Sequence, residues 1–140
     1  MNTNKILLGG LAGGIAFFFL GWLVYGVLLM DFMRDSYNQC SMNPEGQMVW
    51  WALILSNFAY SFLFALIFGW TKTSSWMGGA KIAGIIGLLM SAYYDLSMYS
   101  MSTMFKNLGV VFMDIIIAAV FAAVIGAIIA LVMGMGKKEA

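Results

Sequence analysis

Four apolar runs, each long enough to cross a lipid bilayer as an α-helix, take up most of this sequence. They extend over residues 6–30, 48–70, 77–100 and 108–133. A helix needs about 20 apolar residues to cross a hydrocarbon core of about 30 Å, and it satisfies its own backbone hydrogen bonds there. The short alternating segments of a membrane β-barrel are missing from the sequence. We therefore predict an all-α, polytopic membrane protein whose residues 1–140 form one domain, a bundle of four transmembrane helices.

The composition fits this prediction and excludes several classes of function. The chain is 63% hydrophobic and only 9% charged, whereas about a quarter of a soluble domain is charged. The net charge of +1 speaks against a nucleic-acid partner. With no His and a single cysteine, Cys40, we expect neither a metal site nor a cofactor. The sequence lacks a catalytic Ser/His or Cys/His pair and a phosphate-binding loop, which favours a function other than catalysis.

Positive charge is distributed unevenly between the two ends of the predicted helices. One end carries most of the lysines, and the other end carries Arg34 and Lys106. The lysines at the first end are Lys5, Lys72, Lys81, Lys137 and Lys138. Because positive residues concentrate on the cytoplasmic side of membrane proteins, we predict that both termini are cytoplasmic. The segment Asp31–Gln47, which holds Cys40 and Pro44, is predicted to be a long loop on the outer side.

Small residues recur along the predicted helices at spacings that suit close packing. In lipid, such residues allow two helix backbones to approach each other. The candidates for helix packing are Gly9, Gly13, Gly84, Gly87, Ala118, Ala122 and Gly126. This pattern predicts contacts inside the bundle and association with a second copy or with other membrane proteins. The other expected partner of the chain is the lipid bilayer. The alternative is that Gly and Ala are simply frequent in membrane helices.

Two carboxyl groups inside the predicted helices are the most informative residues of the chain. A charged side chain deep in a bilayer costs about 2.5–3.5 kcal/mol on insertion scales, so it normally faces protein or water. Asp95 and Asp114 lie almost equally far from the turn between the third and fourth helices, and so at similar depth. We expect them to lie close together. The polar residues expected to hold them are Asn57, Tyr25, Tyr94 and Tyr99.

The carboxyl pair allows two functional interpretations. In the first, it is a proton or cation site in a small transporter-like bundle. In the second, the chain is an accessory or assembly protein whose polar residues only hold the helices together, because interhelical hydrogen bonds are routine in membranes. A minor alternative is Cu(I) binding by thioethers, as in Met98-x-x-Met101-x-x-Met104. Against it, Met often fills apolar cores, and steps of three residues rotate the ligands by about 60° each.

The motif Tyr94-Asp95-Leu96-Ser97, followed by Asp114 early in the last helix, resembles a known pattern. It is similar to a bacterial family of short four-helix membrane proteins of unknown function, with Tyr-Asp-Leu-Thr-Asn in the third helix. Gly21-Trp22 and Tyr25 also look like a related family with a Gly-x-x-Trp-Tyr pattern. The resemblance implies a bacterial inner-membrane setting and treats Asp95 and Asp114 as a unit. It implies no particular activity.

Overall fold

The computed structural model describes residues 2–41, 43 and 47–135, which are almost entirely helical. The elements are α1 (Thr3–Leu23), a π-helical turn η1 (Val24–Leu28), α2 (Met30–Ser36), a 3₁₀ turn η2 (Gln39–Ser41), α3 (Trp50–Thr71), α4 (Trp76–Met101) and α5 (Leu108–Gly134). Among these described residues, four segments are long and apolar enough to cross a membrane: Thr3–Leu28, Trp50–Thr71, Trp76–Met101 and Leu108–Gly134. The predicted all-α fold with four such helices is confirmed.

Polar caps fix where the long helices begin and end. The side chain of Ser75 accepts the backbone N–H of Gly78 at the start of α4, and Asn107 accepts that of Val110 at the start of α5. Such caps satisfy N–H groups that have no partner inside the helix. Lys72 ends α3 in a left-handed conformation with φ of 54°. The turns from α3 to α4 and from α4 to α5 are therefore short, and the second turn makes α4 and α5 an antiparallel hairpin.

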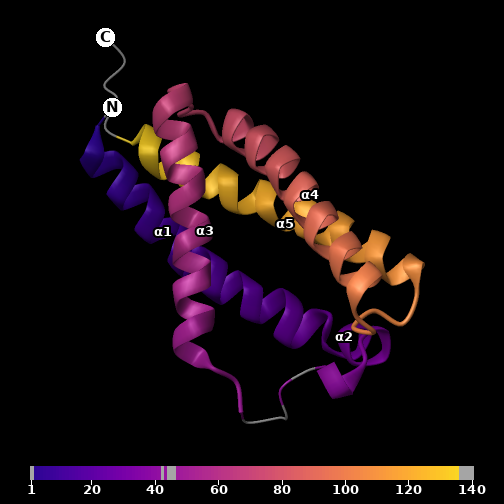
Figure 1. The fold of residues 1–140 in the computed structure, drawn as a ribbon. Helices are drawn as coiled ribbons and strands as arrows, with labels where there is room; N and C mark the ends of the chain where they lie inside the picture. Colours follow the sequence, from indigo (N-terminus) through magenta and orange to yellow (C-terminus); the bar gives the residue numbers. More distant parts are fainter. Residues whose placement is uncertain (1, 42, 44–46, 136–140) are drawn as a thin grey trace.

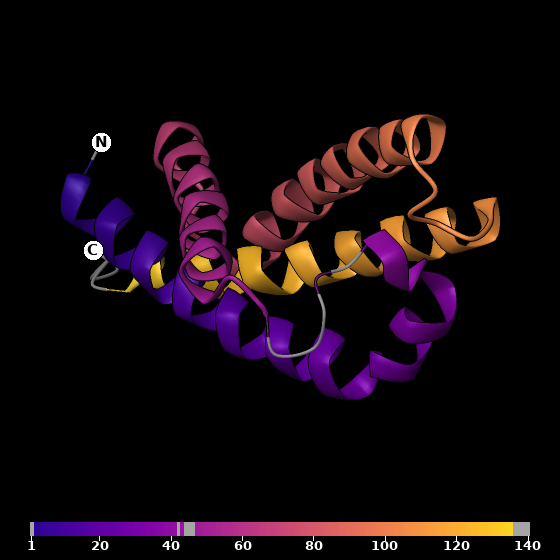
Figure 2. The ribbon, with the colours of Figure 1, turned by 60° about the horizontal axis from the view of Figure 1, so that its bottom comes forward.

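The helices pack as two pairs, α4 with α5 and α1 with α3, and the contact between α1 and α5 joins the pairs. α4 and α5 form a hairpin, α1 packs against both α3 and α5, and α3 touches α5 (Figure 1). Figure 2 shows α3 and α4 rising as separate arms from the layer formed by α1 and α5. The start of α1 and the ends of α3 and α5 gather at one end of the molecule, and α2 lies with the α4–α5 turn at the other.

Small residues bring α4 and α5 into backbone contact. A Cβ atom on Gly126 would overlap the methyl group of Ala83 and lie 2.6 Å from the carbonyl oxygen of Gly79. A Cβ on Gly87 would overlap the methyl group of Ala122. Glycine is therefore required at this crossing because no side chain fits between the two helices. The contact is looser at Gly84, where a Cβ would lie 3.3 Å from its nearest neighbour, the Ala123 Cβ. Ala118 is half-buried, and its carbonyl oxygen lies near Gly87.

The glycines of α1 bring that helix equally close to α3 and α5. A Cβ on Gly13 would overlap the hydroxyl of Ser61 and the side chain of Ile129, and one on Gly9 would lie 2.6 Å from the Met133 Cγ. The fully buried Ser61 donates its hydroxyl hydrogen to the carbonyl of Gly10 at 2.8 Å, so its polar group is satisfied within the core. The core between these helices is formed by Phe17, Phe64, Phe68, Ile125 and Ile129.

The prediction of a long loop over Asp31–Gln47 has to be corrected, because the described part of this segment contains helix. α2 occupies Met30–Ser36 and η2 follows at Gln39–Ser41. Asp31 in the first turn and Arg34 in the last turn of α2 suit the helix dipole. Apolar periodicity over a helix this short is too weak to read from sequence. Pro44 of that predicted loop, and Lys137 and Lys138 of the charge pattern, lie outside the described residues.

Candidate functional site

The structure brings the carboxyl groups of Asp95 and Asp114 together between α4 and α5. They lie within hydrogen-bonding reach of each other. Asp95 is 3% exposed and Asp114 is half-buried. The antiparallel hairpin sets this pairing, because residues equally far from its turn lie at the same level on the two helices. Two neighbouring carboxylates repel each other when both are ionised, so this arrangement favours the binding of a proton or a cation between them.

One oxygen of Asp95 has an unusual environment. Its Oδ2 atom is buried and has no hydrogen-bond donor among the described residues. Buried polar atoms nearly always have a partner, and one that lacks it calls for an explanation such as a bound ion, a water or a functional proton. The site therefore has acceptor capacity that the described protein groups leave unused.

Tyr37, which was not among the predicted site residues, covers the pair from the α2 side. It follows α2 directly, is 4% exposed, and its hydroxyl lies within hydrogen-bonding reach of the Asp114 carboxyl. Burial, followed by the influence of Asp114, raises the pKa of Tyr37 above its ordinary value. The hydroxyl therefore keeps its proton at neutral pH and can donate it to Asp114.

Backbone hydrogen bonds hold this tyrosine against the α4–α5 turn. The Asn38 N–H donates to the Met104 carbonyl at 2.9 Å, and the Lys106 N–H donates to the Ser36 carbonyl at 3.2 Å. These bonds form an isolated antiparallel bridge between Tyr37 and Phe105, whose rings are 5.0 Å apart. We call Ser36–Asn38 together with the turn 102–107 the cover. It closes the end of the α4–α5 hairpin over the carboxyl pair.

Two further bonds strengthen the cover. The Lys106 Nζ donates to the Asp35 carbonyl at 2.7 Å, and the Asn38 side-chain amide donates to the Thr103 carbonyl. Beneath the cover lies a second apolar cluster, separate from the main core. Its buried members are Tyr37, Phe105, Val110, Val111 and Ile115. The carboxyl pair thus lies beside a packed apolar region.

Tyr25 is the predicted polar neighbour that the structure does bring to the pair. It lies in the π-helical turn η1, is half-buried, and interacts electrostatically with both Asp114 and Asp95. Its ring packs on Phe121 at 5.8 Å. Single π-helical turns inside membrane and soluble helices often occur at functional sites, because they change which side chains face inward.

The other predicted neighbours do not converge on the carboxyls. Tyr94 is 54% exposed and Tyr99 is 42% exposed. Since each residue turns a helix by about 100°, Tyr94 faces away from the side that carries its neighbour Asp95. Asn57 is half-buried on α3, which packs mainly on α1, and it makes no hydrogen bond to either carboxyl among the described residues.

The methionine motif does not present three sulfurs to one place. Met98 and Met104 pack against the cluster beneath the cover, whereas Met101 is 73% exposed. Among the described residues there is also no group of three His, Cys, Asp or Glu side chains placed to bind a metal ion. The carboxyl pair is therefore the arrangement in the described chain that offers proton chemistry.

Comparison of the chain with protein-family models, with curated proteins and with solved structures finds no significant match. The functional argument therefore depends on the residues of this chain alone.

Proposed function

We propose that this chain is a multi-pass protein of the inner (plasma) membrane, with both termini cytoplasmic, whose carboxyl pair takes up and releases a proton or a small cation. The observation that carries the proposal is the buried Oδ2 of Asp95, which lacks a donor among the described residues. A pair that only joined two helices would use its acceptors on protein donors. A proton or a small cation at this oxygen would complete the site.

The surroundings of the pair support an exchange that is controlled from the outer side. The cover is a short segment and a turn, joined by a few hydrogen bonds and by the packing of Tyr37 and Phe105, and it contains no long helix. Connections of this kind open at lower free energy than the core of a bundle. The Tyr37 hydroxyl lies within reach of the Asp114 carboxyl, so a proton that enters or leaves the pair can pass by way of this hydroxyl.

Two measurements test the proposal on the purified protein. Infrared difference spectroscopy follows the C=O band of protonated carboxyls as a function of pH. We expect a band that titrates, that is shifted in Asp95→Asn and in Asp114→Asn, and that is absent from the variant with both substitutions. The exposed Asp31 supplies a matched control, because Asp31→Asn should leave the band unchanged. In proteoliposomes that contain a pH-sensitive dye, an imposed potential should drive proton entry that both site variants abolish.

The alternative function, an accessory or assembly protein, has its own supporting observation. α3 and α4 leave large apolar side chains on their outer faces, among them Trp51, Ile85 and Leu89. Lipid, a second copy or another membrane protein can cover them. If the carboxyl band does not titrate and no proton or cation enters the vesicles, this alternative replaces the first. Loss of stability would then be the only effect of the Asp95→Asn substitution.

A further inference from the structure

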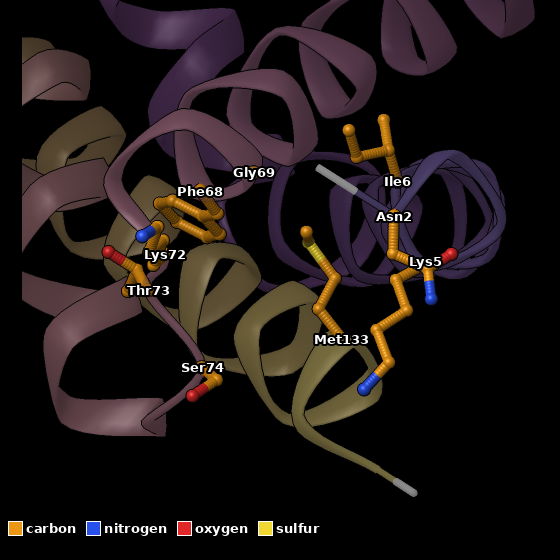
Figure 3. A pocket seen from close by; sticks show the side chains of 9 residues that line it. All are labelled: Asn2, Lys5, Ile6, Phe68, Gly69, Lys72, Thr73, Ser74 and Met133. Carbon is orange, nitrogen blue, oxygen red and sulfur yellow. The ribbon is translucent and has the colours of Figure 1, made fainter. Parts of the chain in front are cut away.

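A cavity of about 240 Å³ lies at the end of the molecule away from the cover (Figure 3). It opens between the start of α1, the end of α3 and the end of α5. Figure 3 shows Lys72 and Thr73 on one side of Met133, and Lys5 and Ile6 on the other. The cavity is independent of the carboxyl pair, because none of its lining residues contributes to that site.

Among the described residues, the polar lining of this cavity has one sign of charge. Lys5 and Lys72 contribute two ammonium groups, and no described Asp or Glu lines the cavity. The Lys5 Nζ donates one hydrogen bond to the Met135 carbonyl at 3.3 Å, which leaves two of its three N–H donors for a ligand. The Thr73 hydroxyl is not a donor for a ligand, because it donates to the Thr71 hydroxyl at 2.7 Å, which itself donates to the Ile67 carbonyl. The ammonium groups are the donors, and they suit an anion with several oxygens.

The apolar lining distinguishes this cavity from a simple surface charge patch. Ile6, Phe68 and Met133 form its floor, and each is almost fully buried in the core shared by α1, α3 and α5. An inorganic ion makes no use of such a floor. A phospholipid does, because its glycerol and acyl carbons continue from the phosphate into the membrane. Basic pockets between transmembrane helices bind anionic headgroups in this way.

We propose that the cavity binds a phosphate group held by Lys5 and Lys72, and that its source is an anionic phospholipid whose apolar part lies on Ile6, Phe68 and Met133. Free phosphate carries the same anion without the apolar part. Because the lysines lie at the end of the spanning helices, a lipid bound here would hold the start of α1 against the ends of α3 and α5.

The test is native mass spectrometry of the detergent-solubilised protein, which counts the lipids that remain bound. We expect retention of phosphatidylglycerol or cardiolipin but not of phosphatidylcholine. Lys5→Gln with Lys72→Gln should lower retention of the anionic lipids at least tenfold. Lys81→Gln is the matched control, since Lys81 is exposed, lies early in α4 and does not line the cavity. It should retain lipid as the unaltered protein does.

A second arm separates the two sources of phosphate. The melting temperature is measured with inorganic phosphate and with chloride at equal ionic strength. Phosphate could raise the melting temperature only when both lysines are present, while no lipid is retained. In that case the cavity still binds phosphate, and the source is the free ion. Equal retention by the double lysine variant and the unaltered protein, with no effect of inorganic phosphate, would overturn the proposal. The proposal is also overturned if the double variant has a lower melting temperature but retains as much lipid as the unaltered protein. The lysines would then only complement the carbonyl ends of helices.

Discussion

The hydroxyl of Tyr37 reaches the carboxyl of Asp114, so a residue outside the membrane-spanning helices closes the polar site that lies between two of them. Tyr37→Phe removes this hydroxyl and keeps the ring that packs on Phe105. We expect the free energy of unfolding in detergent to fall by about 1 kcal/mol, the usual contribution of one buried hydrogen bond. Tyr94→Phe is the control, because Tyr94 is exposed and its hydroxyl does not contact the pair. Equal stability of both variants would mean that the Tyr37 contact is not formed.

The pH dependence of this contact has a definite sign. The pKa of Tyr37 is raised in the folded protein, so the protonated phenol is favoured there. Its contribution to stability is complete below the ordinary tyrosine pKa of about 10, and it is lost as the pH rises above that value toward the folded pKa. The stability difference between the unaltered protein and Tyr37→Phe should therefore shrink above about pH 10. The titration of the other tyrosines affects both proteins equally, so it cancels in this stability difference. A difference that does not change with pH would show that Tyr37 is accessible to solvent.

A double-mutant cycle tests whether Asp95 and Asp114 act as one unit. Replacing either by Asn leaves a single carboxyl without a second carboxyl beside it, whereas replacing both removes the interaction altogether. We expect the effects on unfolding free energy to be non-additive by at least about 0.5 kcal/mol, as for other residues in direct contact. A cycle between Asp95 and the distant, exposed Asp31 should be additive. Additive effects of Asp95→Asn and Asp114→Asn would contradict the pairing of these two carboxyls.

The spanning helices were predictable because apolar length and turn residues are local properties of a sequence. The pairing of Asp95 with Asp114 was also predictable, since a short turn forces two antiparallel helices to bring equidistant residues to one level. Tyr37 was missed because its contact joins segments far apart in the chain. The one local signal was an aromatic residue in the otherwise polar run Asp35–Gln39. Tyr94 was wrongly grouped with its neighbour, because depth in the membrane was considered without the direction in which each side chain points.

The lysine distribution separately predicts how the protein is oriented in the membrane. Cys40 is exposed and is the one cysteine of the chain. A thiol reagent that cannot cross membranes should therefore label it in intact spheroplasts. For the opposite side, Met135→Cys combined with Cys40→Ser places the one thiol at the exposed end of α5. That variant should be labelled only after permeabilisation. The reverse pattern in the two proteins would invert the predicted topology.

The last prediction concerns the crossing of α4 and α5, and it compares two glycines, one at the crossing and one away from it. Gly126 has no room for a Cβ, since Ala83 and the Gly79 carbonyl occupy that place. Gly21 has room, because the nearest atom to its Cβ would be the Phe121 ring at 3.8 Å. Alanine is the better helix former by about 1 kcal/mol, so propensity alone would make both Gly→Ala changes stabilising.

Packing should separate the two variants. Gly21→Ala should be neutral or stabilising, whereas Gly126→Ala should lower the free energy of unfolding by about 1–3 kcal/mol, the usual effect of overpacking a core. Gly126→Leu should lower it further. The measurement is unfolding in mixed detergent, followed by the tryptophan signal. Because α4 and α5 carry Asp95 and Asp114, a wider crossing should also move the carboxyls apart and weaken the coupling measured in their double-mutant cycle. If Gly126→Ala is as stable as Gly21→Ala, the two helices do not meet at this glycine.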